Sequence, residues 1–377
     1  MLSQPPVWFI LIAFIAALGP LVFFHELGHY VVARVFGVGA ESFSIGFGRE
    51  VAGWTDKRGT RWKVGWLPLG GYVKFVGDLN PVSMPGEEKE DLSVEQRRRA
   101  FHCRPVWQRF LIVLAGPAAN FLLAILIFAT FYVAYGRPET PAVIGPVIAN
   151  SAADHAGLKA GDRIISINGS ATRYFQDIQA VTSLRPNYSV DLVYERGSQL
   201  RRVPVRLGSE QRLDEFGQKY VVGLLGVRPP QLVYKRLSVF EAVPAACGAT
   251  ANVTKMMVEI IGQIVTGERS PKELGGPLRM AQVAGQRASL GWSDFVYLIA
   301  LFSINLGFIN LLPVPMLDGG HLALYTVEAV QRRPVSLRAQ EWAFRSGLAF
   351  LLALLIFTTL NDLGSFGLWE SVGRLIG

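Results

Sequence analysis

The sequence predicts an α-helical polytopic membrane protein with four transmembrane helices, a membrane-associated β-hairpin and one extracytoplasmic α+β domain. Half of its 377 residues are apolar and its mean hydropathy is +0.31, which is too apolar for an ordinary soluble protein. Four apolar runs, at roughly 7–31, 108–134, 293–313 and 343–360, reach the length of about 20 residues that a bilayer-spanning helix needs. Between the second and third runs, the chain changes to short alternating stretches and turn glycines, which are typical of a compact domain.

The distribution of charge predicts the orientation of the spans. The formal net charge is +8, but the basic residues crowd beside the apolar runs, so we expect a lipid bilayer and no nucleic acid as partner. Segment 34–109 holds thirteen Lys and Arg against nine Asp and Glu and is expected in the cytoplasm. Four spans then place both termini and segment 135–290 outside. No Lys or Arg precedes Arg34, so we interpret the first run as a retained helix and not as a cleaved signal peptide.

Residues 1–34 form the first predicted transmembrane helix and carry His25-Glu26-Leu27-Gly28-His29. His25 and His29 are four residues apart, so both imidazoles leave one face of a helix and can share a tetrahedral zinc ion. Glu26 lies beside that ion, where a carboxylate can accept a proton from water. The alternative is a membrane helix with a few polar residues packed against its neighbours. Ionisable residues inside a membrane are costly and usually functional, which favours the metal site.

Residues 35–107 are expected to form a cytoplasmic or interfacial β-hairpin and loop. Alternation at 42–46 and at 61–66, with turn residues at 55–59 between them, predicts two strands. Mixed apolar and basic strands suit a hairpin that dips toward the inner membrane surface, although an ordinary small cytoplasmic sheet fits the pattern equally well. Residues 79–99 are polar and are expected to form a surface loop.

The second predicted span, 108–134, opens with small residues that let helices approach closely in lipid. Asn120 within it should face protein, and we expect it to serve packing rather than catalysis. Residues 135–210 contain a short helix, a tight turn, a strand and Asn168-Gly169, a pattern that resembles the PDZ fold of bacterial envelope proteases. Such a domain can offer a sheet edge to a peptide C-terminus.

Residues 211–292 are expected to form an extracytoplasmic linker. Its run from Val239 to Val265 contains Glu241, Lys255 and Glu259, so we predict an amphipathic helix and not a fifth span. A turn at 273–277 should lead into the third transmembrane helix.

The third span and its extension, 293–320, end in Asn310-Leu-Leu-Pro313-Val-Pro315-Met-Leu-Asp318-Gly-Gly. A catalytic zinc usually has three protein ligands and one open position, so the two histidines need a third ligand. Asp318 lies in a segment rich in helix breakers, where unwound backbone can line a cavity. His25 and Asp318 both fall near the cytoplasmic end of the membrane by residue counting. A cytoplasmic loop, 321–342, and a fourth transmembrane helix with a tail, 343–377, complete the expected order.

The two motifs H-E-x-x-H and N-x-x-P-x-P-x-L-D-G together resemble the site-2 protease family of intramembrane zinc metalloproteases. Gly70-Gly71-Tyr72-Val73-Lys74 and Gly116-Pro117-x-x-Asn120 match the family as well. The resemblance implies a metalloendopeptidase in which His25, His29 and Asp318 bind Zn²⁺ and Glu26 is general base and acid. It also implies that Asn310 holds the substrate backbone, and that the hairpin at Gly71 and Tyr72 adds a strand to an unwound substrate. His321 is expected to have a supporting role, because a fourth protein ligand would fill the open position.

The family implies regulated intramembrane proteolysis in the bacterial inner membrane. The expected substrates are single-span membrane proteins of the anti-sigma-factor or remnant-signal-peptide type. The PDZ-like domain would bind peptide C-termini or exclude bulky external domains. Only one such domain is evident, whereas the best-known members carry two in tandem. The alternative function is a non-catalytic membrane scaffold with a PDZ-like partner-binding domain. A transporter is disfavoured because the two halves show no inverted repeat.

Overall fold

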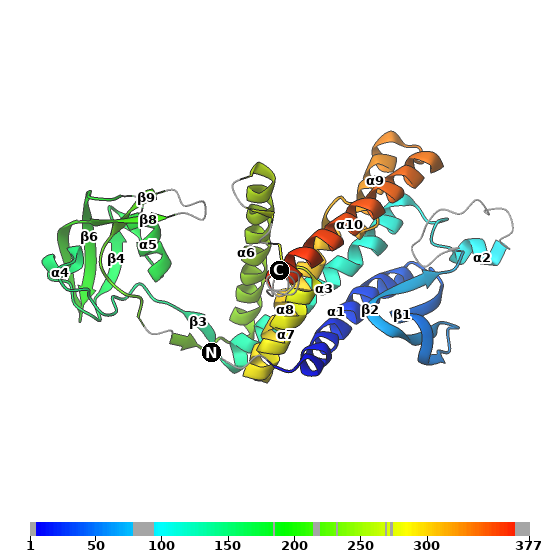
Figure 1. Cartoon of the computed structure of the whole chain (residues 1–377), viewed down its shortest axis with the longest axis horizontal. Coiled ribbons are helices and arrows are strands. Elements are labelled where there is room, and N and C mark those ends of the chain that lie inside the picture. Colours follow the sequence, from blue (N-terminus) through cyan, green and yellow to red (C-terminus); the bar gives the residue numbers. More distant parts are fainter. Residues whose placement is uncertain are drawn as a thin grey trace, which may run out of the picture. The chain divides into compact units, whose positions relative to one another are not determined.

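A computed structural model describes seven stretches of the chain: residues 5–77, 94–183, 185–213, 219–230, 233–267, 270–271 and 274–365. Two compact units emerge. One joins Met1–Ala129 to Val243–Gly377, and the other is Thr130–Ala242. The first unit contains the long apolar helices and the hairpin, and the second contains the expected α+β domain (Figure 1).

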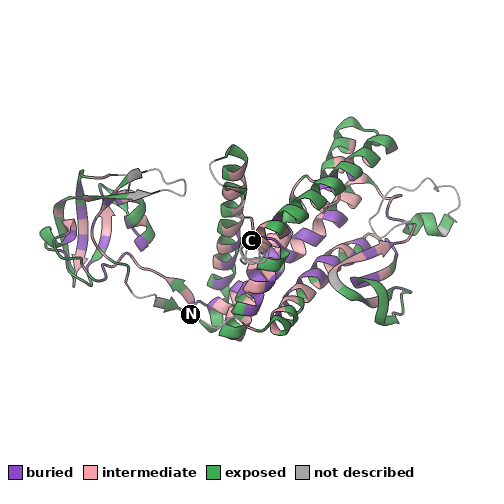
Figure 2. Ribbon diagram, in the orientation of Figure 1, coloured by how far each residue is buried: buried purple, intermediate pink, exposed green. Residues whose placement is uncertain are grey.

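Four helices among the described residues are long and apolar enough to cross a membrane, and they fit the predicted membrane protein. They are α1 (Val7–Val35), α3 (Val106–Ala134), α8 (Trp292–Leu311) and α10 (Leu337–Ser365). Large apolar side chains such as Leu126, Phe350 and Ile356 are more than half exposed on these helices (Figure 2). Exposed apolar surface of this extent is typical of side chains that face lipid.

Small residues on α1 allow the helices of this unit to pack closely. Ala13 and Ala17 are buried together with Leu21, and they pack with Leu123 of α3 and Phe295 of α8. This cluster anchors the half of α1 that precedes the histidines.

Helix α7 (Pro277–Leu290) was not predicted, since the sequence indicated only a turn before the third span. Pro277 occupies the first turn of α7, a position that accepts proline. The polar composition of this segment favoured a turn in the sequence analysis. Asp362 of α10 is fully buried and caps this helix by accepting hydrogen bonds from Gly276 N and Arg279 N, at 3.0 and 2.9 Å. The predicted amphipathic helix is present as α6 (Val239–Thr266).

The chain breaks between α8 and α9 (Asp318–Gln331), as the helix-breaking residues predict. Met316 in this break has φ of +81°, a left-handed conformation that is costly for a residue with a side chain. Segment 321–342 was expected to be a loop, but α9 fills its first half and α10 begins at Leu337. The prediction of a loop was wrong because the basic residues indicate only the side of the membrane, whereas Leu322 and Tyr325, three residues apart, pack on one hydrophobic cluster as a helix allows.

The predicted hairpin is formed by β1 (Ala40–Thr55) and β2 (Arg61–Phe75), with Asp56 holding the turn through hydrogen bonds from the N–H groups of Arg58 and Thr60. It folds back on itself. Residues 42–45 pair on one side with 71–74 and on the other with 61–64, and 61–64 also pair with 52–55. Positive φ at Gly46 and Gly48 permits this bend, so two long strands make a sheet of four segments. The expected loop at 79–99 lies largely outside the described residues, but its end forms helix α2 (Val94–Arg99).

The second unit is an α+β domain. Its main sheet is antiparallel with the order β5-β4-β6-β7, formed by β4 (Arg163–Ile167), β5 (Ser170–Ala171), β6 (Ser189–Arg196) and β7 (Gln199–Arg206). Helices α4 (Ala152–His155) and α5 (Phe175–Ser183) complete it, and a second sheet pairs β8 (Gly208–Leu213) with β9 (Lys219–Leu224).

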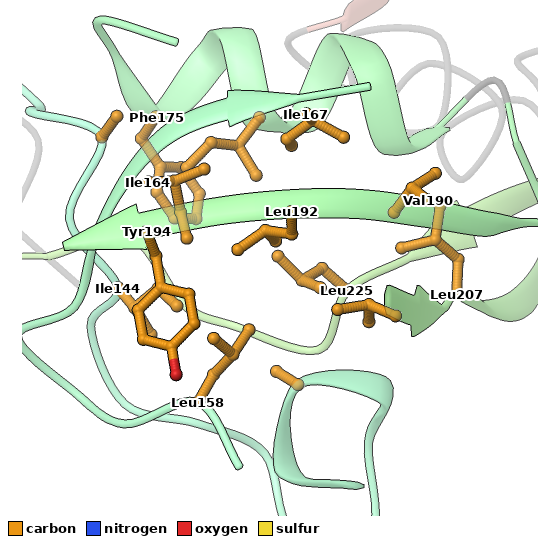
Figure 3. Packing of buried hydrophobic residues seen from close by; sticks show 14 residues of the cluster. Ile144, Leu158, Ile164, Ile167, Phe175, Val190, Leu192, Tyr194, Leu207 and Leu225 are labelled. Carbon is orange, nitrogen blue, oxygen red and sulfur yellow. The ribbon is translucent and has the colours of Figure 1, made fainter. Parts of the chain in front are cut away.

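Buried aliphatic side chains fill the core of this domain, among them Ile164, Ile167 and Leu192 (Figure 3). Leu225 belongs to the same core, so the domain continues past residue 210, where the sequence suggested that it ends. At its base, β3 (Arg137–Glu139) pairs antiparallel with β10 (Val233–Lys235), which brings the entering and leaving chain segments together.

Candidate metal centre

The two histidines of the H-E-x-x-H motif lie one above the other on α1. Their Nε2 atoms are 3.3 Å apart, and both side chains are nearly buried. The helical spacing of four residues produces this arrangement, because residues i and i+4 share a face.

Asp318 is the first residue of α9 and reaches the same point. One carboxylate oxygen, Oδ2, lies 3.1 Å from His25 Nε2, and the other, Oδ1, lies 3.5 Å from His29 Nε2. The break that precedes α9 folds tightly over its first turn, since a Cβ on Gly319 would lie 2.2 Å from the carbonyl oxygen of Leu312. The glycine after Asp318 therefore lets the break deliver this carboxylate to the histidines.

These three side chains fit a zinc ion. A tetrahedral zinc with bonds of 2.0–2.1 Å separates neighbouring ligand atoms by about 3.3 Å. The two Nε2 atoms are separated by 3.3 Å, close to that value, and each has one Asp318 oxygen at a similar distance, Oδ2 at 3.1 Å from His25 and Oδ1 at 3.5 Å from His29. Asp318 Oδ2 is buried without a hydrogen-bond partner, as expected for an oxygen that serves a cation. In the described part of the chain, His25, His29 and Asp318 are the residues that cluster in a metal-binding geometry.

Helix α3 supports His29 from behind. The Nδ1 atom of His29 lies 2.9 Å from the carbonyl oxygen of Ile112, to which it can donate a hydrogen bond. With its proton on Nδ1, the ring presents a lone pair on Nε2, the atom that faces Asp318. Gly116, one turn further along α3, leaves the room for this ring, since a Cβ there would lie 2.2 Å from His29 Nε2.

Glu26 and the hairpin form one wall of a cavity of about 490 Å³ beside this cluster. Gly71 lets the edge of the hairpin approach α1 closely, because a Cβ on Gly71 would lie 3.1 Å from Glu26 Cγ. The structure brings every candidate site residue from the sequence to this cavity. Its lining includes His25, Glu26, His29, Gly71, Tyr72, Asn310 and Asp318.

His321 also lines the cavity but lies outside the cluster of three. Its ring packs against Phe344, with ring centroids 5.1 Å apart, and against Tyr325 at 6.3 Å. The hydrogen bond between His29 Nδ1 and the carbonyl oxygen of Ile112 was not predicted, because any residue at position 112 would supply the same backbone group.

The four long apolar helices and this cluster of possible metal ligands point to a membrane metallohydrolase, and comparison with known proteins agrees on the class. The model of the Peptidase family M50 matches residues 13–354. A protein of Agrobacterium fabrum named as a zinc metalloprotease is 42% identical over 360 residues, covering 94% of this chain and 96% of its own. Metalloprotease MmpA of Caulobacter vibrioides is 38% identical over 390 residues, covering 97% of this chain and 98% of its own.

The chain belongs to peptidase family M50. It is a zinc metalloprotease, and its apolar helices fit a multi-pass membrane protein. Among solved structures, one match is the PDZ domain of an SdrC-like protein from Listeria monocytogenes. The match covers 25% of this chain and 88% of that chain, with 21% sequence identity and a TM-score of 0.19.

Proposed function

We propose that this protein cleaves single-span membrane proteins at or within the bilayer, as in regulated intramembrane proteolysis. The observation that carries the proposal is the position of the metal cluster. Two of its three residues, His25 and His29, lie on α1, where no charged residue occurs from Val7 to Phe24 and side chains such as Trp8 and Ile12 are exposed. A hydrolytic centre on such a helix can reach a peptide bond that lies in lipid.

His25, His29 and Asp318 are proposed as the zinc ligands. When bound, zinc acts as a Lewis acid toward the scissile carbonyl and lowers the pKa of water to about 7. Glu26 does not belong to the ligand cluster and lines the same cavity. We assign it the proton transfer: it takes the proton of the attacking water and gives it to the leaving amide nitrogen.

The hairpin edge at Gly71 and Tyr72 is proposed to hold the substrate as an added strand. Residues 71–74 pair with 42–45 on one side. On their other side, the described residues supply no strand, and Gly71, Tyr72 and Val73 face the cavity. An extended peptide can bind such an edge through main-chain hydrogen bonds. Asn310 lines the same cavity from α8 and can bind a peptide group of that strand.

The location in the bacterial inner membrane, with both termini and the α+β domain outside, is part of the proposal. It rests on the excess of basic residues in segment 34–109. Anti-sigma factors or remnant signal peptides are the proposed substrates, by resemblance to the family. The domain at 135–210 and its continuation are proposed to act as a PDZ-like module that screens or binds external parts of substrates. A non-catalytic scaffold would not need Glu26 in the cavity.

Replacing Glu26 by Gln tests the proposal. Zinc content of the purified protein should stay unchanged, whereas cleavage should fall by about 100-fold or more because the proton acceptor is lost. His25→Ala should lose both, and Asp318→Asn should bind zinc more weakly, because an amide is a poorer ligand than a carboxylate. Quantifying membrane-protein fragments in cells with wild-type protein or Glu26→Gln identifies the substrates. An unchanged fragment pattern, or loss of zinc from Glu26→Gln, would contradict the assigned roles.

A further inference from the structure

Asn120 of α3 lies directly behind His25. Its side chain is fully buried, and its Nδ2 atom lies 3.2 Å from His25 Nδ1, the ring nitrogen that points away from Asp318. Its other amide atom, Oδ1, is buried without a hydrogen-bond partner. Packing alone gives no reason to keep an amide here, since an unpaired buried polar atom costs about 1–3 kcal/mol.

The position of Asn120 repeats the support that His29 receives. Ile112, Gly116 and Asn120 follow one another at four-residue intervals and share a face of α3. Ile112 offers its carbonyl oxygen to His29 Nδ1, Gly116 makes room for the His29 ring, and Asn120 meets His25 Nδ1. One stripe of α3 therefore contacts both imidazoles.

The orientation of the Asn120 amide decides what His25 can do. If Nδ2 faces the ring, it donates to Nδ1, and the proton of a neutral imidazole must sit on Nε2. Nε2 is the atom 3.1 Å from Asp318, and with a proton it cannot bind a metal. A half-turn of the amide places Oδ1 against Nδ1 instead, and the imidazole proton then sits on Nδ1. With Nδ2 against the ring, Oδ1 is buried without a partner, so hydrogen bonding inside the protein does not require this orientation. The ligand role of His25 requires the other one.

We propose that Asn120 is a positioning residue that accepts a hydrogen bond from His25 Nδ1 through Oδ1 and so keeps the Nε2 lone pair directed at the metal. The proposal rests on the proposed zinc ligands. It gives Asn120 a function in metal binding, where the sequence suggested packing. Ser303 of α8 donates its Oγ hydrogen to the main-chain carbonyl oxygen of Asn120 at 2.7 Å, a contact that does not involve the side-chain amide.

Zinc affinity of the purified, full-length protein, measured by competition with a chromogenic chelator, tests this role. Asn120→Leu keeps the approximate size of the side chain but removes the acceptor, and should weaken zinc binding by about 10–100-fold, the usual effect of losing a partner of a metal-bound histidine. Asn120→Asp keeps an acceptor and has no donor, so its affinity should remain within about threefold of wild type, since carboxylates commonly fill this position. If Asn120→Leu does not fold, Asn120→Ala should show the same weakening.

Two further variants distinguish a failure of the role assigned to Asn120 from a failure of the ligand assignment. Ser303→Ala removes a hydrogen bond to the same residue without touching the imidazole, and should bind zinc as the wild type does. His25→Ala reports on the ligand assignment itself. Wild-type affinity in Asn120→Leu, with zinc lost from His25→Ala, would overturn the role of Asn120 alone. Equal weakening in Asn120→Asp and Asn120→Leu would show that an acceptor at this position does not preserve zinc binding, and would overturn the proposed orientation. Zinc retained by His25→Ala would overturn the ligand assignment.

Discussion

At the scale of single residues, the contact between Gly116 and His29 is a close steric constraint on the centre. We expect Gly116→Ala to lower zinc affinity by roughly tenfold or more, because the added Cβ, 2.2 Å from Nε2, forces the ring to move. Chelator competition measures this change. Gly19→Ala, in the same membrane unit, is the matched control, since a Cβ on Gly19 meets no atom within 4 Å. Similar zinc affinities in the two variants would contradict the close contact.

The clustering of His25, His29 and Asp318 could be predicted from the sequence, and the groups that contact the two histidines could not. His25 and His29 are four residues apart, so local helix geometry alone brings them together. The supporting atoms of Ile112 and Asn120 lie 83 and 95 residues away from the histidines that they contact. That pairing depends on how α1 and α3 pack, which no local pattern encodes. Asp318 was identified because its carboxylate follows a run of helix breakers.

At the scale of elements, the ion pair between buried Asp162 and partly exposed Arg196 ties β6 to the turn before β4. Arg196 donates to both carboxylate oxygens at 2.7 Å, and the Lys159 N–H donates at 2.8 Å. Burial acts to raise the pKa of Asp162, but the hydrogen bonds and the positive charge of Arg196 outweigh it and hold the pKa below its usual value.

The stability of the α+β domain should therefore depend on pH. A carboxyl group with a lowered pKa in the folded state stabilises the fold above its unfolded pKa of about 3.9. That contribution is lost as the pH falls through the folded value. The protection factors of backbone amides in β4 and β6, taken relative to unstructured amides at the same pH, should fall below about pH 4. Arg196→Met should already show lower protection than the wild type at pH 7, because Asp162 loses both hydrogen bonds from the guanidinium, and should respond less to acid. An unchanged pH response in Arg196→Met would exclude this pair as the cause.

Elements with strong periodicity could be predicted, and elements that depend on distant partners could not. The four apolar helices and the amphipathic α6 follow from hydropathy and spacing. Helix α7 has a polar composition and is held by Asp362, a residue 86 positions after Gly276. The hairpin strands alternate clearly, but their folding into four segments depends on long-range pairing of residues 42–45 with 71–74, which the local alternation does not specify.

At the scale of the whole molecule, the proposed orientation is open to chemical labelling. In a background with Cys103 and Cys247 replaced by Ser, we introduce a cysteine at exposed Ser170 or at exposed Lys57. A membrane-impermeant thiol reagent applied from outside intact spheroplasts should label position 170 and leave position 57 unlabelled until the cells are lysed. The reverse pattern would invert the proposed topology.

The α+β domain is proposed to exclude bulky substrates rather than to recruit them. Removing residues 140–232 and joining β3 to β10 through a short Gly-Ser linker deletes the complete domain at its base. Substrates that still carry an external domain should then be cleaved, and trimmed substrates should be cleaved at similar rates as before, in a membrane assay with both. Slower cleavage of trimmed substrates, with intact ones still resistant, would identify the domain as a recruiter.

The antiparallel pairing of Arg137–Glu139 with Val233–Lys235 has a consequence for how such genes change. A coding segment whose product begins and ends at the same place can be duplicated, exchanged or lost in one event, while the flanking helices keep their connection. The copy number of the inserted module is therefore free to differ between lineages. Selection can therefore change which substrates the module admits to the centre without changing the catalytic residues.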